Sequence, residues 1–189
     1  QLQTLYDLSV LINQTLDLNE LLPIALDRAT YLTRFEMGGI YLFKEEEGIL
    51  ELKHYRGYSA DFAEKVRALQ LGEGVAGQAA LLRQPIVRSI HEHPSSQLLP
   101  FLKEIGIQSL VGIPLLAKGK AIGAITLLSR SLHPLTQREI HLLESTGIQI
   151  GLALENAILF SAVAKAKSEW ERTIDAETEL NINREKKKT

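Results

Sequence analysis

The chain has 189 residues, enough for one domain with a hydrophobic core and an appended helix. Its 21 basic and 23 acidic side chains give a formal net charge of −2, which excludes the broad basic surface that attracts nucleic acids and anionic membranes. The absence of cysteine excludes disulfides, thiolate nucleophiles and thioether-linked cofactors, and it fits a cytoplasmic protein.

The first third of the chain predicts two helices followed by a β-hairpin. Apolar residues recur at helical spacing over residues 2–16, and Asp17 is expected to cap a second helix over about 19–34. Because the chain starts without Met and is helical from its first residues, we expect a fragment of a larger protein. Two apolar runs, 39–43 and 49–55, then flank a charged turn. One face of the second strand is expected to carry Leu50, Leu52 and His54.

The middle of the chain predicts three short helices and an edge strand. The helices span about 61–69, 75–82 and 98–105, and Ser59 is the expected cap of the first. Residues 86–87 form the expected edge strand, which directly follows a proline.

The strongest β signal comes next, followed by a long helix. Strands over 109–116 and 122–128 are apolar on both faces, so helices are expected to cover both sides of the sheet. Thr136 and Glu139 form a capping box that opens a helix from about residue 137 into the 160s or further. One domain of the α+β class, with a largely antiparallel sheet, accounts for all of these elements.

The long helix carries two apolar stripes, which indicate two packing partners: the protein's own sheet and another helix. The first stripe contains Ile140, Leu143, Ile150, Leu154 and Ala157. The second contains Ile148, Leu152, Leu159 and Val163.

Four segments in this order resemble those of GAF domains: 71–80, 84–87, 106–115 and 119–125. The resemblance covers about residues 5–160. It implies a GAF-like (profilin-like) fold, with a central antiparallel sheet, helices on both faces, and long N- and C-terminal helices. It also implies a pocket for a small molecule. A covalent bilin is excluded because its attachment needs cysteine, and the signature of cyclic-nucleotide-binding members is missing.

The resemblance further implies a division of the chain and a role. Residues 1–163 would form the sensor domain with its bundle helices, and 164–189 a helical linker or the start of the next module. Such domains commonly form homodimers through their N- and C-terminal helices, and relay a state change to an output domain of the same chain. We therefore expect a non-catalytic domain from a cytoplasmic sensor histidine kinase or cyclase, with neither nucleic acid nor membrane as partner.

Two functions remain open for the pocket. In the first, an unidentified small molecule binds non-covalently; in the second, the domain is a dimerisation spacer whose pocket is filled by its own side chains. Some free-standing relatives reduce methionine sulfoxide, but that chemistry depends on cysteine. The candidate ligand-binding residues are Tyr41, His54, Tyr58, Val75, Arg88, Phe101 and Ser109. For His54 a satisfied core histidine is the competing interpretation, and for the aromatic residues simple packing.

Two motifs suggest other sites. Residues 72–77 match G-x-G-x-x-G, but the preceding segment and the short following helix do not fit a dinucleotide fold. We expect these glycines to allow a sharp turn and close packing, while N–H groups at Val75 and Ala76 could hold an anionic group. His91 and His93 invite a metal ion, but Pro94 and the polar surroundings favour a solvated loop.

Overall fold

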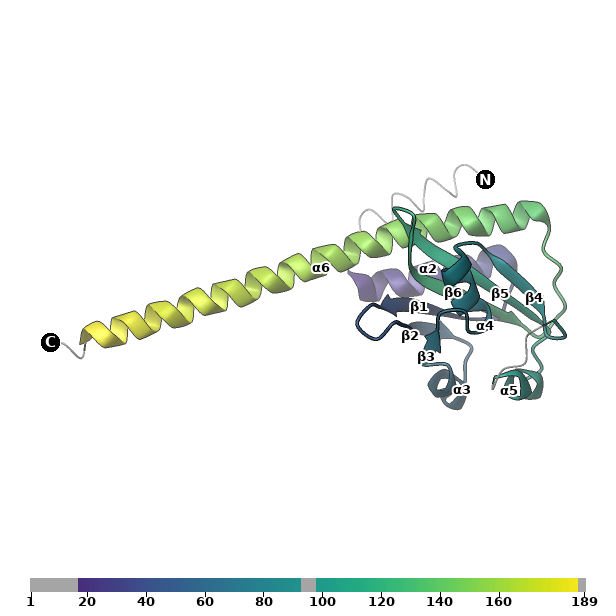
Figure 1. Ribbon diagram of the computed structural model, residues 1–189, viewed down its shortest axis with the longest axis horizontal. Coiled ribbons are helices and arrows are strands. Elements are labelled where there is room, and N and C mark those ends of the chain that lie inside the picture. Colours follow the sequence, from purple (N-terminus) through teal and green to yellow (C-terminus); the bar gives the residue numbers. More distant parts are fainter. Residues whose placement is uncertain (1–16, 93–97, 187–189) are drawn as a thin grey trace.

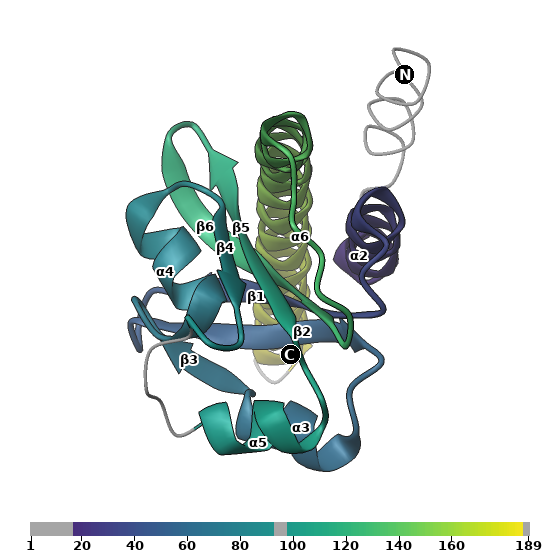
Figure 2. The same cartoon turned by 90° about the vertical axis from the view of Figure 1, so that its right-hand side faces the viewer.

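The fold is a six-stranded antiparallel sheet with helices on both faces (Figures 1 and 2). This computed structural model describes residues 17–92 and 98–186, with side chains through residue 174. The predicted helix over 2–16 lies outside the described residues. The strands lie in the order β3-β2-β1-β6-β5-β4. They are β1 (Met37–Lys44), β2 (Ile49–Arg56), β3 (Ala68–Gln70), β4 (Ile86–Ser89), β5 (Ser109–Ala117) and β6 (Lys120–Ser129).

The helices form two layers with the sheet between them. Those described are α2 (Leu18–Thr33), α3 (Ala60–Lys65), α4 (Gly74–Leu82), α5 (Leu99–Glu104) and α6 (Gln137–Lys186). Figure 2 shows α2 and α6 side by side on one face, with α4 on the other and α3 and α5 together at the lower edge. The central strands are thus covered on both sides, which confirms the expectation from their two apolar faces.

Local signals in the sequence fix several element ends. The side chain of Asp17 accepts a hydrogen bond from the Asn19 N–H (2.8 Å) and caps α2 as predicted. The capping box is also confirmed, since the Glu139 carboxylate accepts from the Thr136 N–H (2.8 Å). Lys118 and Gly119 both have positive φ, which gives the β5–β6 hairpin a tight two-residue turn.

Helix α6 lies so close to β5 because two of its residues are glycines. A Cβ atom at Gly147 would lie 2.4 Å from the Pro114 carbonyl oxygen, and one at Gly151 would lie 2.4 Å from that of Leu116. The helix continues far beyond the sheet, to Lys186 (Figure 1). In the described part of the chain, Gln137–Ile174 is long and apolar enough to cross a membrane by length and composition alone, a criterion that core helices of soluble proteins also meet.

Two predictions about the β2–β3 region are wrong. The helix expected over 61–69 ends at Lys65, and Ala68–Gln70 instead pairs with β2 as strand β3. His54 does not share a face with Leu52: the register shifts so that Leu52 pairs with Tyr41 and His54 with Ile40. This β-bulge adds one residue to β2, and it turns His54 to the face covered by α2.

Candidate functional site

A small cavity lies between the sheet and the layer formed by α3, α4 and α5. Its volume is ≈ 30 Å³, and its lining is apolar apart from two tyrosines and Thr126. Ligand pockets typically have volumes of about 300–1,000 Å³, so the cavity is essentially filled by the protein's own side chains. The sheet contributes Tyr41, Leu110 and Leu128 to the lining, and α4 contributes Val75 and Ala76.

The hydroxyl groups of Tyr41 and Tyr58 meet inside this site. Tyr41 is 1% exposed on β1, and its side chain forms a hydrogen bond with that of Tyr58. Burial is the main cause that raises the pKa of both phenols above the ordinary tyrosine value. The pair is therefore neutral over the physiological range, and the two hydroxyls are hydrogen-bond partners in an apolar environment.

Tyr58 reaches this position because residue 39 has no side chain. A Cβ atom at Gly39 would lie 3.0 Å from the Tyr58 hydroxyl oxygen and 3.1 Å from its Cε2 atom. Tyr58 itself lies in the segment between β2 and α3, directly after Gly57, whose φ of +76° suits a sharp turn. A loop tyrosine thus occupies a space that the sheet leaves open.

A row of aromatic rings connects this tyrosine to both short helices. Tyr58 stacks on Tyr55 with ring centroids 5.6 Å apart, and it meets the edge of Phe62 at 4.7 Å. Phe62 stacks in turn on Phe101 at 5.5 Å, and the Lys65 Nζ atom lies 5.1 Å from the centre of the Phe101 ring. The row ties β2, α3 and α5 together beside the cavity.

The glycine motif at 72–77 serves close packing. A Cβ atom at Gly77 would lie 2.4 Å from the Gln70 carbonyl oxygen, and one at Gly112 would lie 2.0 Å from that of Val75. Helix α4 therefore starts directly against β5. The antiparallel pairing of the sheet contradicts a dinucleotide fold, which needs a parallel βαβ unit.

The predicted ligand-binding residues fall into three places. Tyr41, Tyr58 and Val75 line the central cavity, and Phe101 contacts it through Phe62. Arg88 and Ser109 line a separate hollow of ≈ 210 Å³ at the β4 edge. There the Ser109 hydroxyl accepts from the His133 N–H (2.9 Å), and an Arg88 Nη1 atom donates to the Val87 carbonyl (3.1 Å). His54 lies on the opposite face of the sheet from the central cavity.

The two-histidine motif at 91–93, for which a solvated loop was the favoured interpretation, gains no ligand set among the described residues. The Glu92 carboxylate accepts from the Ser89 N–H (3.1 Å), and this bond lowers the pKa of Glu92. His93 lies outside the described residues. Within 17–92 and 98–186 no cluster of three acidic or histidine side chains is placed to hold a metal ion.

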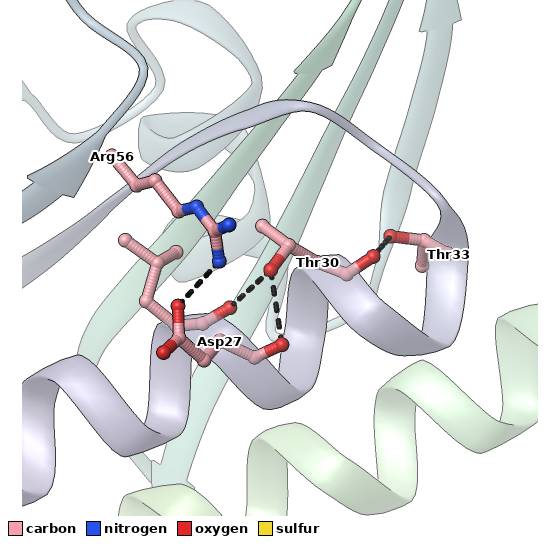
Figure 3. Close-up of polar contacts among 5 residues, drawn as sticks. Asp27, Thr30, Thr33 and Arg56 are labelled. Atoms are coloured by element: carbon pink, nitrogen blue, oxygen red, sulfur yellow. Dashed lines mark hydrogen bonds and ion pairs between the residues drawn. The ribbon is translucent and has the colours of Figure 1, made fainter.

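An open hollow of ≈ 580 Å³ beside α2 was missed by the sequence analysis. Figure 3 shows Arg56 reaching from the end of β2 to Asp27 on α2, with 2.7 Å between the Nη1 and Oδ1 atoms. The hydroxyls of Thr30 and Thr33 donate to backbone carbonyls of α2 (Figure 3), and Tyr31 is 78% exposed. Arg56 faces α2 only because of the bulge in β2, which the sequence pattern does not reveal.

Comparisons with known proteins agree with this architecture. Over 136 residues the chain is 29% identical to the Nif-specific regulatory protein of Azospirillum lipoferum. This aligned region covers 67% of this chain and 21% of that protein. The chain thus spans about a fifth of the length of the curated relatives that it matches.

Several solved structures share the fold. The GAF domain of a phosphoenolpyruvate-protein phosphotransferase from Coxiella burnetii has a TM-score of 0.71 at 20% identity, over 85% of this chain and 96% of that one. The GAF domain of a two-component sensor histidine kinase from Bacillus halodurans has a TM-score of 0.63 at 20% identity, over 78% and 99%. A free methionine-R-sulfoxide reductase from Neisseria meningitidis has a TM-score of 0.66 at 19% identity, and the match covers 80% of this chain and 86% of that one.

Likeness at these identities concerns the fold alone, since one fold supports many functions. The family assignment comes from the sequence. The GAF domain family model matches residues 15–155, which include the six described strands and most of the sheet-packed part of α6. The chain therefore belongs to the GAF domain family.

Proposed function

We propose that this GAF domain is a regulatory module of a cytoplasmic signal-transduction protein, and that α6 relays its state to an output module within a homodimer. The proposal rests on α6, which is packed on the sheet along one side and exposes apolar side chains along the other. The named relatives are consistent with it, since they include a regulatory protein and a sensor histidine kinase.

The two sides of α6 have different environments. Leu143, Ile150 and Leu154 are at most 1% exposed, and they belong to the core that contains β5 and β6. On the other side Leu159 and Val163 are 51% and 68% exposed. Exposed apolar side chains in a row along a helix indicate a partner, and the same row on a second copy is the partner that we propose.

The sheet provides a physical connection between the cavity and α6. Leu110 on β5 and Leu128 on β6 line the cavity, while Val111 and Leu127, their neighbours in sequence, pack in the core on the α6 side. Because Gly147 and Gly151 place α6 against the β5 backbone, a displacement of β5 would move α6 with it. Two poses of the paired helices would then give the output module two states.

The filled cavity favours a relay or spacer that binds no ligand in this conformation. Small-molecule sensing is the second candidate, and the paired hydroxyls of Tyr41 and Tyr58 support it, because an apolar filling would need no polar groups. A ligand would take the place of the Tyr58 ring. Such a molecule would be about the size of a phenol, apolar on its faces and polar at one end.

The dimer is tested by a charge placed on the exposed side of α6. Val163→Glu should convert the dimer to a monomer in light scattering after gel filtration, because the new carboxylates would face each other in the interface. Ser161→Glu, on the opposite side of the same exposed stretch, is the matched control and should stay dimeric. Monomers in the wild-type protein, or equal behaviour of both variants, would contradict the proposal.

The ligand site is tested by removal of the tyrosine ring. Tyr58→Ala should bind phenol and gain thermal stability with increasing phenol concentration, whereas the wild-type protein should respond far less. Arg88→Ala, which changes the separate hollow at the β4 edge, is the control and should behave like the wild type. If phenol stabilises all three proteins equally, the cavity is not its site.

A further inference from the structure

We infer that the two α6 helices pack in parallel on an 11-residue repeat that continues well beyond the domain. This inference rests on the homodimer proposed above, and it specifies the side chains and the phase of the contact. Ile148, Leu159 and Trp170 follow one another at 11-residue intervals and are 40%, 51% and 67% exposed. Leu152, Val163 and Ile174 repeat at the same interval, with exposures of 41%, 68% and 42%.

The interval keeps all six side chains on one line along the helix. Eleven residues in three turns correspond to about 3.67 residues per turn, close to the 3.6 of a straight α-helix. We name these six residues the α6 stripe. It lies opposite the residues that pack on the sheet, such as Ile150 and Leu154.

A seven-residue repeat would bury polar groups instead. If Ile148 and Leu152 began a heptad pattern, the later contact positions would include Glu169 and Thr173. The 11-residue pattern replaces these two by Trp170 and Ile174. Desolvation of unpaired carboxylates opposes the heptad phase, so the helices should leave the domain without the left-handed supercoil of a heptad coiled coil.

The stripe has sharp ends. One repeat earlier, the equivalent positions are Gln137 and His141, and one repeat later they are Asn181 and Glu185. The apolar contact thus covers residues 148–174, about 40 Å of helix at 1.5 Å per residue. Its last third lies on the part of α6 that extends away from the sheet (Figure 1).

The charges that border the stripe allow a second copy to approach. The Glu155 carboxylate lies 3.3 Å from the Lys118 Nζ atom at the β5–β6 turn of its own domain. Lys167 and Glu171 face each other at 3.8 Å on the flank of the last repeat. Glu155, Lys167 and Glu171 therefore each have an opposite charge within their own chain, which limits repulsion between identical surfaces.

A second copy is the occupant that fits this surface best. Two helices stay in contact over three repeats only when their apolar periods agree, and an identical helix has the same period by necessity. In a parallel pair each residue of the α6 stripe lies next to the same residue of the second copy. The two domains therefore lie at one end of the pair and the two helical extensions at the other.

Single-cysteine cross-linking of the 189-residue protein tests the phase, because the natural chain has no cysteine of its own. W170C and I174C lie in the contact of the predicted 11-residue phase, whereas E169C and T173C lie in that of the heptad phase. A166C lies in the contact in both phases and serves as the positive control. Oxidation should give several-fold more disulfide-linked dimer at 166, 170 and 174 than at 169 and 173. The E169C and T173C variants retain Trp170 and Ile174, so weak linkage there cannot come from a damaged stripe.

The alternative outcomes are distinguishable. High yields at 166, 169 and 173 would overturn the 11-residue phase and leave the proposed dimer intact. A dimeric mass without linkage at any single position would overturn the parallel arrangement. A monomeric mass for every protein would overturn the dimer itself.

Discussion

The hydroxyl of Tyr58 occupies the space that a side chain at Gly39 would fill, only 3.0 Å from the position of the missing Cβ atom. A residue from the loop between β2 and α3 and a residue within β1 thus depend on each other. This relationship closes the central cavity, which the chain's own side chains fill.

Gly39→Ala should destabilise the domain because the new methyl group displaces Tyr58. We expect a loss of about 1–3 kcal/mol in the free energy of unfolding, as is usual for overpacking. Leu52 Cδ1 also lies close, at 2.9 Å, so part of the loss will not depend on Tyr58. In the Tyr58→Ala background the same substitution should cost clearly less. Equal losses in both backgrounds, measured by urea unfolding, would refute the coupling.

Alkaline pH should destabilise the protein through the buried tyrosine pair. Burial raises the pKa of Tyr41 and Tyr58 in the folded state, so the unfolded chain loses these protons first. The free energy of unfolding is therefore unaffected by these two tyrosines below pH about 10. It decreases as the pH rises further, by up to about 1.4 kcal/mol per pH unit for each tyrosine. Tyr58→Phe should show a shallower fall between pH 9.5 and 11.5. An unchanged slope would contradict the role of the pair.

Gly151→Ala should disrupt the contact between α6 and β5. The added Cβ atom would lie 2.4 Å from the Leu116 carbonyl oxygen and 2.6 Å from its nitrogen, both backbone atoms that cannot rotate away. We expect a loss of about 1–3 kcal/mol, although alanine is the better helix former by about 1 kcal/mol. Ser161→Ala, at an exposed position of the same helix, should be nearly neutral. Thermal unfolding of both variants tests this, and a gain in stability for Gly151→Ala would contradict the packing.

The fluorescence of Trp170 should report the contact between two α6 helices. It is the chain's sole tryptophan and is 67% exposed in the single chain, so its emission should shift to shorter wavelength as dimers bury it. Dilution of the protein should reverse the shift, while Val163→Glu should keep the long-wavelength emission at every concentration. Emission that stays constant while the mass changes from monomer to dimer would place Trp170 outside the interface.

Local signals made much of the fold predictable. The cap at Asp17, the capping box at Thr136 and the glycine turn at Gly119 act within a few residues, so their effect can be inferred from neighbouring sequence alone. Two strands with apolar residues on both faces likewise required helices on both sides.

The candidate site was less predictable because it depends on distant contacts. The bulge in β2 moves the His54 side chain to the other face of the sheet, and no residue type in that strand indicates a bulge. Arg88 and Ser109 lie near strand ends as expected, but sheet order places them at the far edge from Tyr41. On α6 the second stripe was visible as far as Val163. Its continuation has only two large apolar residues, Trp170 and Ile174, within residues 164–174, and polar neighbours mask it.

Native mass spectrometry of the freshly purified protein, compared with the denatured chain of 21.1 kDa, tests the central claim most directly. The account predicts twice the mass of one chain under native conditions, and no added mass while Tyr58 fills the cavity. A dimer that releases a small molecule on denaturation would favour the sensor over the spacer. A single-chain mass at every concentration would contradict the relay through paired α6 helices.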